Sequence, residues 1–578
     1  MTVRLSRPRR TARITFEDGR VFSAEIDARL EEYVAAATAG EQDAAPAIAA
    51  IIDGKLTELN RHVRHDGYAK LVRLNSADGA RIYRRSLTFL LIAVARKTFP
   101  EAHVYVEHSI TNGGYFCQIE GRDPLTKQEI AALEREMRQV VEANLPIQRT
   151  EMPLDEAMAL FEKQGDTEKL ELLKQRHKPT FIVYSLLDTK DYFHGYMAPS
   201  TGHLRYFALE LANDGFLLRF PQQDSPTHIT PIALGSRPPL FDVFTETSHW
   251  LRTLGIRNVA GLNRSIEAGR LTEVILVSEA LHEQRISNIA AEIAARRGQL
   301  RVVLIAGPSS SGKTTFARRL AVRLLALGIR PLAVSVDDYF VDRAHTPRDE
   351  NGEYDFESLY TVDLLFLNRQ INQLIAGESV QLPHFDFHTG ERGKGHLVQA
   401  PPHGVLIVEG IHALNPALLP EVDPALCYRV YVSALTQLNL DRYNRASTTD
   451  TRLLRRIVRD VRTRGYSATE TIARWESVRR GERRWIFPHQ NNADVMFNSA
   501  LPYELSVLKP LALPLLRQIE VGTPEWIEAN RLLARLQWFR PGETDHIPSD
   551  SILREFIGGS ILEDYRPWLT STQVGSDG

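Results

Sequence analysis

"LIAGPSSSGKTTFARRLAVRLLALGI", residues 304–329, decides the fold of the C-terminal half of this chain. The apolar run at its start is typical of a central parallel strand, and Phe316, Leu320 and Leu324 then recur at helical spacing. Between the two lies the complete G-x-x-x-x-G-K-[ST] pattern of a phosphate-binding loop. We predict that this loop binds a nucleotide through Gly307, Pro308, Ser309, Ser310, Ser311, Gly312, Lys313, Thr314 and Thr315.

Each residue type in the loop has a chemical reason. The glycines let the backbone wrap around the phosphates with its N–H groups pointing inward. Lys313 reaches the β- and γ-phosphates of the nucleotide, and the hydroxyl of Thr314 is a ligand for Mg²⁺. Because residue types, spacing and the strand–loop–helix context agree, we expect a nucleotide site here rather than a chance glycine-serine loop.

Acidic residues follow two further apolar strands of the predicted sheet. "PLAVSV" (331–336) is followed by Asp337 and Asp338, either of which is placed to take a proton from an acceptor hydroxyl. The alternative for these aspartates is a turn or a helix N-cap. "GVLIVEGIHAL" (404–414) carries Glu409 at the end of its strand, where a carboxylate holds Mg²⁺ through water.

An arginine-rich stretch, residues 449–485, follows these strands. Arg452, Arg455, Arg456 and Arg459 fall on neighbouring turns of one predicted helix. Facing a triphosphate, they would form a lid that neutralises the charge of the transferring phosphoryl group. A solvated helix face and an RNA-binding surface are the alternatives.

The bulk properties of the chain are those of an ordinary protein of several domains. Its 578 residues are too many for one hydrophobic core. The net charge of −2 gives no overall argument for nucleic acid or an anionic membrane, and no apolar run is long enough to span a bilayer. The two cysteines, Cys117 and Cys427, argue against a disulfide framework and fit a reducing cytosol, so we predict a cytoplasmic protein.

Hydrophobic and turn patterns predict a multidomain organisation. Two alternating runs around "EDGR" indicate a β-hairpin near the N-terminus, and Thr126 and Glu129 form the capping box of a later helix. The predicted segments are a small β-rich domain at 1–65, an α+β domain at 66–221, a turn-rich connector with a helix at 222–298, an α/β phosphate-loop domain with a parallel sheet at 299–500, and a helical tail with a polar end at 501–578.

Residues 299–500 resemble the uridine kinase and phosphoribulokinase family of P-loop kinases. The resemblance rests on "GPSSSGKTT", "SVDDYF", "EYDFESLYTVD", "LPHFDFHTGER", "IVEGIHAL" and "TRLLRRIVRDVRTRG", which occur in the family's order. It implies ATP and Mg²⁺, with Asp337 as the catalytic base, Glu409 as a magnesium carboxylate and Asp355 as a ligand of the substrate hydroxyl. The lid arginines would be Arg456, Arg459 and Arg464, and further substrate contacts would be Tyr339, His388 and Tyr466.

Two positions depart from the family's pattern. Nucleoside kinases of the family often carry a histidine where Gly390 stands here, with His388 two residues earlier. Tyr466 replaces a substrate-contacting arginine. Both departures bear on recognition of the acceptor and leave the residues for ATP and Mg²⁺ unchanged.

The N-terminal half resembles parts of threonyl-tRNA synthetase. Residues 12–65 resemble the ubiquitin-like, β-grasp TGS domain, and residues 66–221 resemble the synthetase's second N-terminal, editing-type domain. The second resemblance rests on "DGARIYRRSLTFLLIAVARKTFPEAHVYVEHSITNGGYF" and "DYFHGYMAPSTGHLRYFALE". We expect this fold to lack the zinc and the hydrolytic activity of editing proteins, because no competent zinc ligand stands at the positions of their pocket motifs: Arg85, Phe89, Phe193 and Met197.

These observations predict a nucleoside kinase that transfers phosphate from ATP to the 5′-hydroxyl of a pyrimidine nucleoside, uridine or cytidine by resemblance. A kinase of another small alcohol or of a sugar phosphate is one alternative. An RNA-binding or regulatory protein that uses ATP as a switch is another, and the synthetase-like half motivates it. The predicted partners are ATP and a small-molecule acceptor, without a membrane; tRNA and a homo-oligomer stay open.

Overall fold

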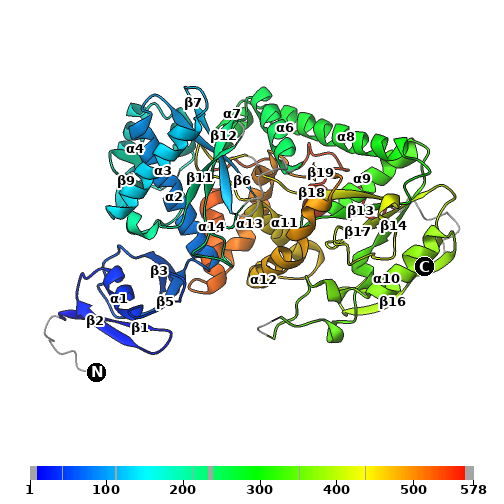
Figure 1. Ribbon diagram of the computed structural model, residues 1–578, viewed down its shortest axis with the longest axis horizontal. Coiled ribbons are helices and arrows are strands. Elements are labelled where there is room, and N and C mark those ends of the chain that lie inside the picture. Colours follow the sequence, from blue (N-terminus) through cyan, green and yellow to red (C-terminus); the bar gives the residue numbers. More distant parts are fainter. Residues whose placement is uncertain are drawn as a thin grey trace.

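The computed structural model describes residues 9–41, 43–110, 113–176, 178–212, 214–231, 239–349, 352–436 and 438–565. Figure 1 shows a small N-terminal sheet domain, a middle α+β domain and a phosphate-loop domain, with helices α11 to α14 in the centre. The polar end predicted for the tail lies outside the described residues. Within them, no helix has the length and apolar character needed to cross a bilayer.

The N-terminal domain is a five-stranded sheet packed against one helix. Its strand order is β2-β1-β5-β3-β4, with β1 and β5 parallel and the other pairs antiparallel. The predicted boundary at residue 65 falls just before β5, so the sheet extends to Arg73. The elements are β1 (Thr11–Phe16), β2 (Val21–Glu25), α1 (Leu30–Ala37), β3 (Ala47–Ile52), β4 (Lys55–Glu58) and β5 (Gly67–Arg73).

The middle domain contains two antiparallel sheets, in the orders β11-β12-β7-β6 and β10-β9-β8. The buried helix α2 packs on the first of them, and α3 begins at the predicted capping box, where Thr126 and Glu129 bond each other's backbone N–H. The elements are α2 (Ala77–Thr98), β6 (His103–Ile110), β7 (Gly114–Glu120), α3 (Lys127–Glu142), β8 (Gln148–Pro153), α4 (Leu154–Lys163), α5 (Thr167–Leu173), β9 (Thr180–Leu186), β10 (Thr189–Asp191), β11 (Ala208–Ala212) and β12 (Gly215–Arg219).

The phosphate-loop domain has the predicted parallel sheet. The strand order is β14-β17-β13-β18-β19, and β13 and β17 are buried along their whole length, as expected of strands covered on both faces. The sheet strands are β13 (Val302–Ala306), β14 (Pro331–Ser335), β17 (Val405–Glu409), β18 (Cys427–Ser433) and β19 (Val495–Asn498), and the helices are α9 (Lys313–Ala326), α10 (Leu364–Ile375), α11 (Thr448–Thr463) and α12 (Ala468–Gly481).

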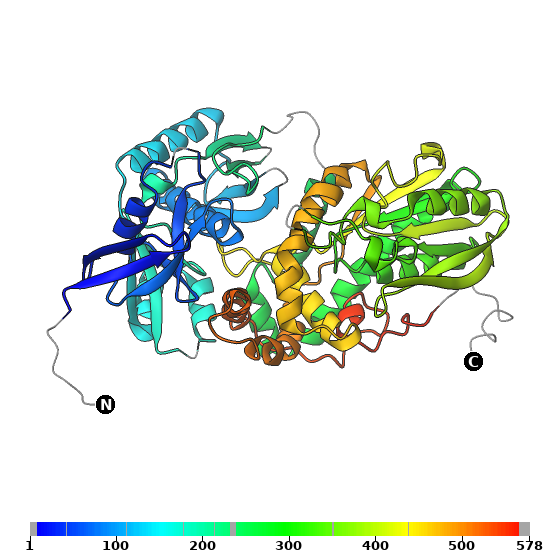
Figure 2. The same ribbon diagram turned by 90° about the horizontal axis from the view of Figure 1, so that it is seen from below.

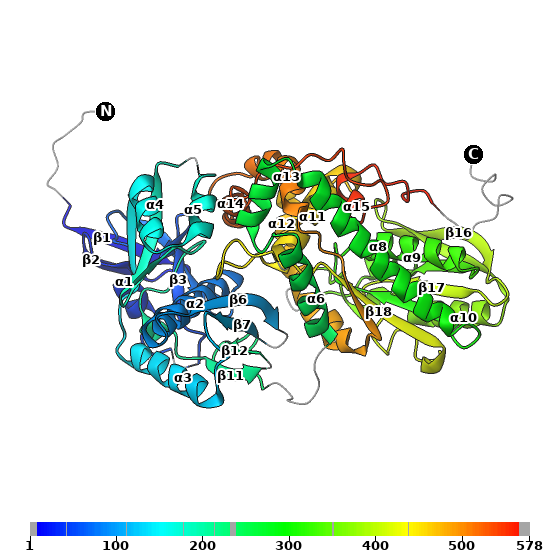
Figure 3. The same ribbon diagram turned by 90° about the horizontal axis from the view of Figure 1, so that it is seen from above.

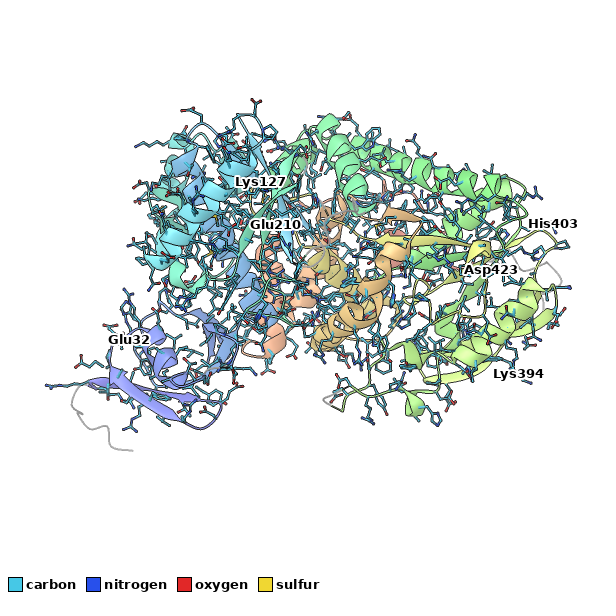
Figure 4. The ribbon with its side chains drawn as sticks, in the orientation of Figure 1. Glu32, Lys127, Glu210, Lys394, His403 and Asp423 are labelled. Atoms are coloured by element: carbon cyan, nitrogen blue, oxygen red, sulfur yellow. The ribbon has the colours of Figure 1, made fainter. Side chains whose placement is uncertain are left out.

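A separate hairpin, β15 (Ser379–Asp386) and β16 (Glu391–Gln399), extends from this domain. In Figure 4, Lys394 of β16 and Glu32 of α1 lie at opposite ends of the molecule. The helices α11 and α12, gold in Figure 2, lie between the middle domain and the parallel sheet.

The stretch predicted as a connector, 222–298, is built mainly of packed helices. They are α6 (Pro239–Thr253), α7 (Val259–Glu267) and α8 (Leu271–Ala295). The helix predicted to start at residue 277 begins six residues earlier, and its Glu279 and Glu283 pair with Arg319 of α9 at 3.4 and 3.1 Å. The reason is burial: Ile275, Ile286 and Ile293 belong to the main hydrophobic core.

One hydrophobic core contains residues of the middle domain, the helices α6 to α8, the phosphate-loop domain and the tail. It includes Phe181 of β9, Ile286 of α8, Ile305 of β13 and Trp538 near the C-terminus, so the middle and phosphate-loop domains pack as one body. The tail adds α13 (Glu504–Arg517) to the predicted helix, which is α14 (Pro524–Leu536). The chain then returns along the phosphate-loop domain to the short helix α15 (Arg554–Ile557), as Figure 3 shows.

Candidate active site

The phosphate loop connects β13 to α9 at the carboxyl edge of the parallel sheet. Gly312, the residue before α9, has a φ of 83°, in the left-handed region that glycine adopts without steric cost. A β-carbon at this position would also lie 2.4 Å from Cγ2 of Ile552. Both facts explain why the second glycine of the motif is required, and they place the C-terminal segment directly over the loop.

Thr314 and Glu409 form the part of the site that could hold Mg²⁺. The Thr314 hydroxyl donates to Oε1 of Glu409 at 3.0 Å, while the buried Oε2 has no hydrogen-bond partner. Burial raises the pKa of Glu409 to about 7, against the opposing effect of Lys313. An unpartnered carboxylate oxygen beside a hydroxyl fits Mg²⁺, which takes one or two protein oxygens and completes its shell with phosphates and water.

Asp337 lies one strand away from Glu409, just after β14. The two strands are neighbours, with Ser335 opposite Glu409, and the charge of Asp337 helps to raise the pKa of Glu409. The next residue, Asp338, is held by the backbone N–H of Phe385 at 3.2 Å and lies 3.2 Å from Nδ1 of His384. Asp338 therefore anchors the β15–β16 hairpin, and Asp337 is the aspartate whose charge acts on Glu409.

The predicted lid arginines lie on α11 and at its C-terminus. Arg456 donates to the Ser309 hydroxyl of the phosphate loop at 2.9 Å. Arg459 donates twice to Asp460, at 2.7 and 2.9 Å. The positive charge of Arg459 is the largest influence that lowers the pKa of Arg464 to about 10, and burial is the second. The helix thus brings Arg456 directly to the loop and holds two further arginines close together.

Two other arginines of the same helix have structural roles. Arg452 forms a buried ion pair with Glu482, and Arg455 forms one with Glu504. Arg452 also donates to the carbonyl of Ser309 at 3.1 Å. These pairs fix α11 against the loop and against α13, so the arginine-rich stretch is not one solvated face.

Glu357 is a second buried carboxylate whose electrostatic surroundings include the phosphate site. Burial raises the pKa of Glu357 to about 7, and Arg456, Lys313 and Asp337 all contribute to its electrostatic surroundings. Its Oε2 has no hydrogen-bond partner and the residue is 8% exposed. Asp355, predicted as the substrate ligand, instead accepts the backbone N–H of Glu357 at 3.2 Å. Sequence reasoning missed Glu357, although it lies in the quoted motif.

Three other predicted substrate contacts have the following surroundings in the structure. Tyr339 is 1% exposed, and its hydroxyl donates to Gln370 at 2.8 Å within the core under α10. The structure thus places the Tyr339 side chain in the core, three residues after the buried Val336 of the same one-turn helix. His388 lies exposed in the β15–β16 turn, bonded through its backbone to Asp386. The ring of Tyr466 packs under the guanidinium of Arg474 at 4.5 Å.

The C-terminal segment places a carboxylate on the phosphate loop. Glu555 of α15 accepts the Thr315 backbone N–H at 3.2 Å and the Thr315 hydroxyl at 2.7 Å. Thr315 belongs to the predicted nucleotide-binding residues, and an amide at a helix N-terminus is a donor for phosphate. Glu555 therefore occupies a donor that a nucleotide phosphate would use, and no sequence signal indicated it.

We expect Glu555→Gln to raise the affinity for ATP by about 10-fold. The substitution removes the negative charge beside the phosphates and weakens a charge-assisted hydrogen bond worth about 1.5–3 kcal/mol. Equilibrium binding of ATP to both proteins measures the change. Glu543→Gln, at an exposed position of the same segment, is the matched control. Equal affinities of the Glu555→Gln variant and the unmodified chain would show that the Glu555 carboxylate does not compete with ATP.

The middle domain brings together the four positions of the pocket motifs. The rings of Phe89 and Phe193 are 5.0 Å apart, and Met197 lies beside the hydroxyl of Ser86. The guanidinium of Arg85 donates to the carbonyl of Tyr196. Aromatic, thioether and guanidinium groups thus stand at the motif positions, and no group of three metal-ligating side chains occurs among the residues that the structure describes.

We expect the purified chain to contain no stoichiometric zinc and to hydrolyse no aminoacyl-tRNA. The physical reason is that arginine and phenylalanine offer no zinc ligand and a lone methionine is a poor one. Elemental analysis of protein prepared without chelator measures the metal. One zinc per chain that disappears on substitution within residues 66–221 would contradict the expectation.

Comparison with known proteins supports the division into two unlike halves. Residues 302–505 match the model of the Phosphoribulokinase / Uridine kinase family. In the N-terminal region, the chain is 30% identical over 197 residues to a threonine–tRNA ligase of Halorhodospira halophila, which covers 34% of this chain and 30% of the ligase. Threonine–tRNA ligase 1 of Bacillus subtilis is 31% identical over 198 residues, with the same shares covered.

Solved structures with detectable similarity include two kinases. One is titled a possible uridine kinase from Bacillus stearothermophilus; it is 24% identical, covers 37% of this chain and 98% of its own, and has a TM-score of 0.26. The other is D-glycerate 3-kinase from Cryptococcus neoformans. It is 17% identical, covers 46% of this chain and 89% of its own, and has a TM-score of 0.20.

The sequence matches confirm both predicted resemblances. The C-terminal half carries a P-loop kinase domain similar to the phosphoribulokinase and uridine kinase family, and the N-terminal half is similar to threonyl-tRNA synthetase. The chain spans less than a third of the length of the synthetases that it matches.

Proposed function

We propose that this chain is an ATP- and Mg²⁺-dependent kinase that phosphorylates the 5′-hydroxyl of a pyrimidine nucleoside. One observation carries the proposal: Lys313 and Asp337 act electrostatically on the same two buried carboxylates, Glu357 and Glu409. A phosphate-binding lysine and an aspartate that both act on two buried acids fit the arrangement that phosphoryl transfer needs.

In the proposed reaction, each group has a defined role. Lys313 and the loop amides hold the β- and γ-phosphates of ATP, and Arg456 approaches from the loop side. Asp337 accepts the proton of the acceptor hydroxyl as its oxygen forms a bond to the γ-phosphorus, and ADP leaves with the electrons of the broken bond. Mg²⁺, when bound at Thr314 and Glu409, would neutralise charge on the phosphates.

An exposed aromatic ring supports a flat acceptor such as a nucleoside base. Phe387, in the β15–β16 turn, is 41% exposed, and the guanidinium of Arg464 lies 5.2 Å from its ring centroid. The charge of Asp337 acts on the same guanidinium. The Phe387 ring and the Arg464 guanidinium lie near Asp337, the proposed general base. They offer a stacking surface and a hydrogen-bond donor to a heterocycle.

A kinase of another small alcohol is the second candidate. The observation that favours it is the placement of Tyr466 under Arg474 and of His388 in an exposed turn, because both were predicted as acceptor contacts. The altered Gly390 lies in the same turn. Transfer of labelled phosphate from ATP to a panel of nucleosides, sugars and sugar phosphates separates the two candidates.

The same assay tests the kinase assignment itself. A protein that uses ATP only as a switch for RNA binding would show no steady turnover with any small-molecule acceptor. If uridine and cytidine both fail at millimolar concentration while another alcohol supports turnover, the nucleoside assignment is wrong and the second candidate stands.

A further inference from the structure

A large cavity lies where the middle domain, the phosphate-loop domain and α14 meet. Its volume is about 990 Å³, at the upper end of the range for small-molecule sites. Figure 1 shows α14 between α2 and α12, and all three helices contribute to its lining. Pro308 of the phosphate loop lines it, as do Arg85 and His194 of the middle domain. Lys313 and Asp337 do not line it, so the cavity adjoins the phosphate loop without including these two groups.

The cavity is strongly basic. Its lining contains ten arginines and two lysines against three acidic side chains, and five of the arginines form ion pairs with acids in or beside the lining. The arginines that form no ion pair among the described residues are Arg84, Arg85, Arg176, Arg445 and Arg479. The lining therefore keeps an excess of positive charge, although the whole chain has a net charge of −2. Such a surface raises the local concentration of anions and favours those with several charges.

Part of this positive charge has no acidic partner. Asp450 accepts hydrogen bonds from Arg531 at 2.7 and 2.8 Å and also forms an ion pair with Arg535. Its single negative charge is thus shared by two arginines and compensates no others. Arg85 has its hydrogen bond to a backbone carbonyl, and no ion pair joins Arg85 or Arg479 to an acid among the described residues. Burial, reinforced by neighbouring arginines, lowers the pKa of both guanidinium groups to about 10.

Aromatic rings alternate with the arginines along the lining. Arg84 lies over the ring of Phe220 at 5.5 Å, and Arg445 lies over the ring of Tyr115 at 4.9 Å. Trp526 of α14 adds a further ring. Aromatic faces stack on nucleobases and arginines bind phosphates, so the two kinds of side chain together match a ligand that has both groups.

We propose that this cavity binds a free nucleotide with several phosphates, as a second ligand besides the ATP of the phosphate loop. The volume suits one nucleoside triphosphate, the charge suits its polyphosphate chain, and the rings suit its base. Arg452 connects the two sites, because it lines the cavity and donates to the Ser309 carbonyl of the phosphate loop. Arg452 is therefore a residue that the cavity and the phosphate loop share.

The test is the number of nucleotides bound per chain. Equilibrium dialysis of the full chain with labelled UTP and with labelled ATP should give two sites for at least one of them. Arg85→Met together with Arg479→Met should remove one site, weakening it at least 10-fold, because each substitution removes a charge-assisted contact to phosphate. Arg135→Met, at an exposed position of α3, should leave both sites intact.

Stability and competition distinguish the possible outcomes. The double variant should unfold at the same or a higher temperature than the unmodified chain without ligand, because it removes uncompensated buried charge. Site numbers that do not differ between the double variant and the unmodified chain would overturn the proposal. Stronger competition by a six-nucleotide single-stranded RNA than by UTP would also overturn it, in favour of an RNA-end site. Failure of all kinase assays would leave this binding result unaffected.

Discussion

Asp337→Asn should lower kcat by about 100- to 10,000-fold, the usual contribution of a positioned general base. The binding of ATP should change little, because the proposed function has the triphosphate held by Lys313 and the loop amides rather than by this aspartate. Asp337 follows β14, next to the strand that carries Glu409, and its charge reaches Glu409 and Glu357. Steady-state kinetics with saturating acceptor, together with a separate ATP-binding measurement, test both parts.

Asp338→Asn is the matched control for this prediction. Asp338 contacts the Phe385 amide and His384, so its substitution should loosen the β15–β16 hairpin without removing a base. We expect kcat to fall by less than about 10-fold, the effect of losing one hydrogen bond outside the reacting groups. If Asp338→Asn abolishes activity while Asp337→Asn retains it, the base lies one residue further along the chain.

The phosphate site could be predicted from the sequence because its geometry is local. The loop, its lysine and its threonine are consecutive, and a strand–loop–helix unit places them without reference to the rest of the chain. Glu409 was predictable for a related reason: neighbouring parallel strands end at the same edge of the sheet, so an acid at one strand end meets a phosphate loop at another.

The acceptor side was harder to predict because it depends on which way loop side chains point. Asp355 and Glu357 are two residues apart in an irregular segment, and neither helical nor strand periodicity assigns them to a face. The structure assigns them through Gly481 of α12, where a β-carbon would lie 2.2 Å from Cβ of Glu357. A glycine more than a hundred residues away thus makes room for the buried acid.

The parts outside the two domain families were also poorly indicated by local pattern. The helices α6 to α8 and the segment after α14 take their structure from a shared core with both halves of the chain. Glu555 illustrates the limit: it is one acid in an ordinary sequence, and it is significant only because the chain returns to Thr315. Long-range contacts of this kind have no signature in composition or spacing.

Glu357→Gln should lower kcat/KM for the acceptor by about 10- to 100-fold, whereas Asp355→Asn should have little effect. A buried carboxylate with an unpartnered oxygen is placed to accept a hydrogen bond from an acceptor hydroxyl, and charge-assisted bonds of this kind contribute about 1.5–3 kcal/mol. The two variants make the same chemical change two residues apart. Acceptor kinetics at saturating ATP compare the two variants directly. A larger fall of kcat/KM in Asp355→Asn than in Glu357→Gln would show that Asp355 is the acid that binds the acceptor hydroxyl.

The pH dependence gives this prediction a second test. The pKa of Glu357 is about 7 in the acceptor-free chain, so kcat/KM should fall as the pH drops below 7 and the carboxyl loses its charge. In Glu357→Gln this limb should flatten.

The raised pKa of Glu357 has the opposite effect on stability: the neutral carboxyl stabilises the fold below its ordinary pKa of 4.5, and this contribution is lost as the pH rises through 7. Glu357→Gln should therefore melt at a higher temperature than the unmodified chain at pH 8, with no such gain at pH 4. A variant that keeps the acidic limb and gains no stability at pH 8 would show that Glu357 is not the titrating group.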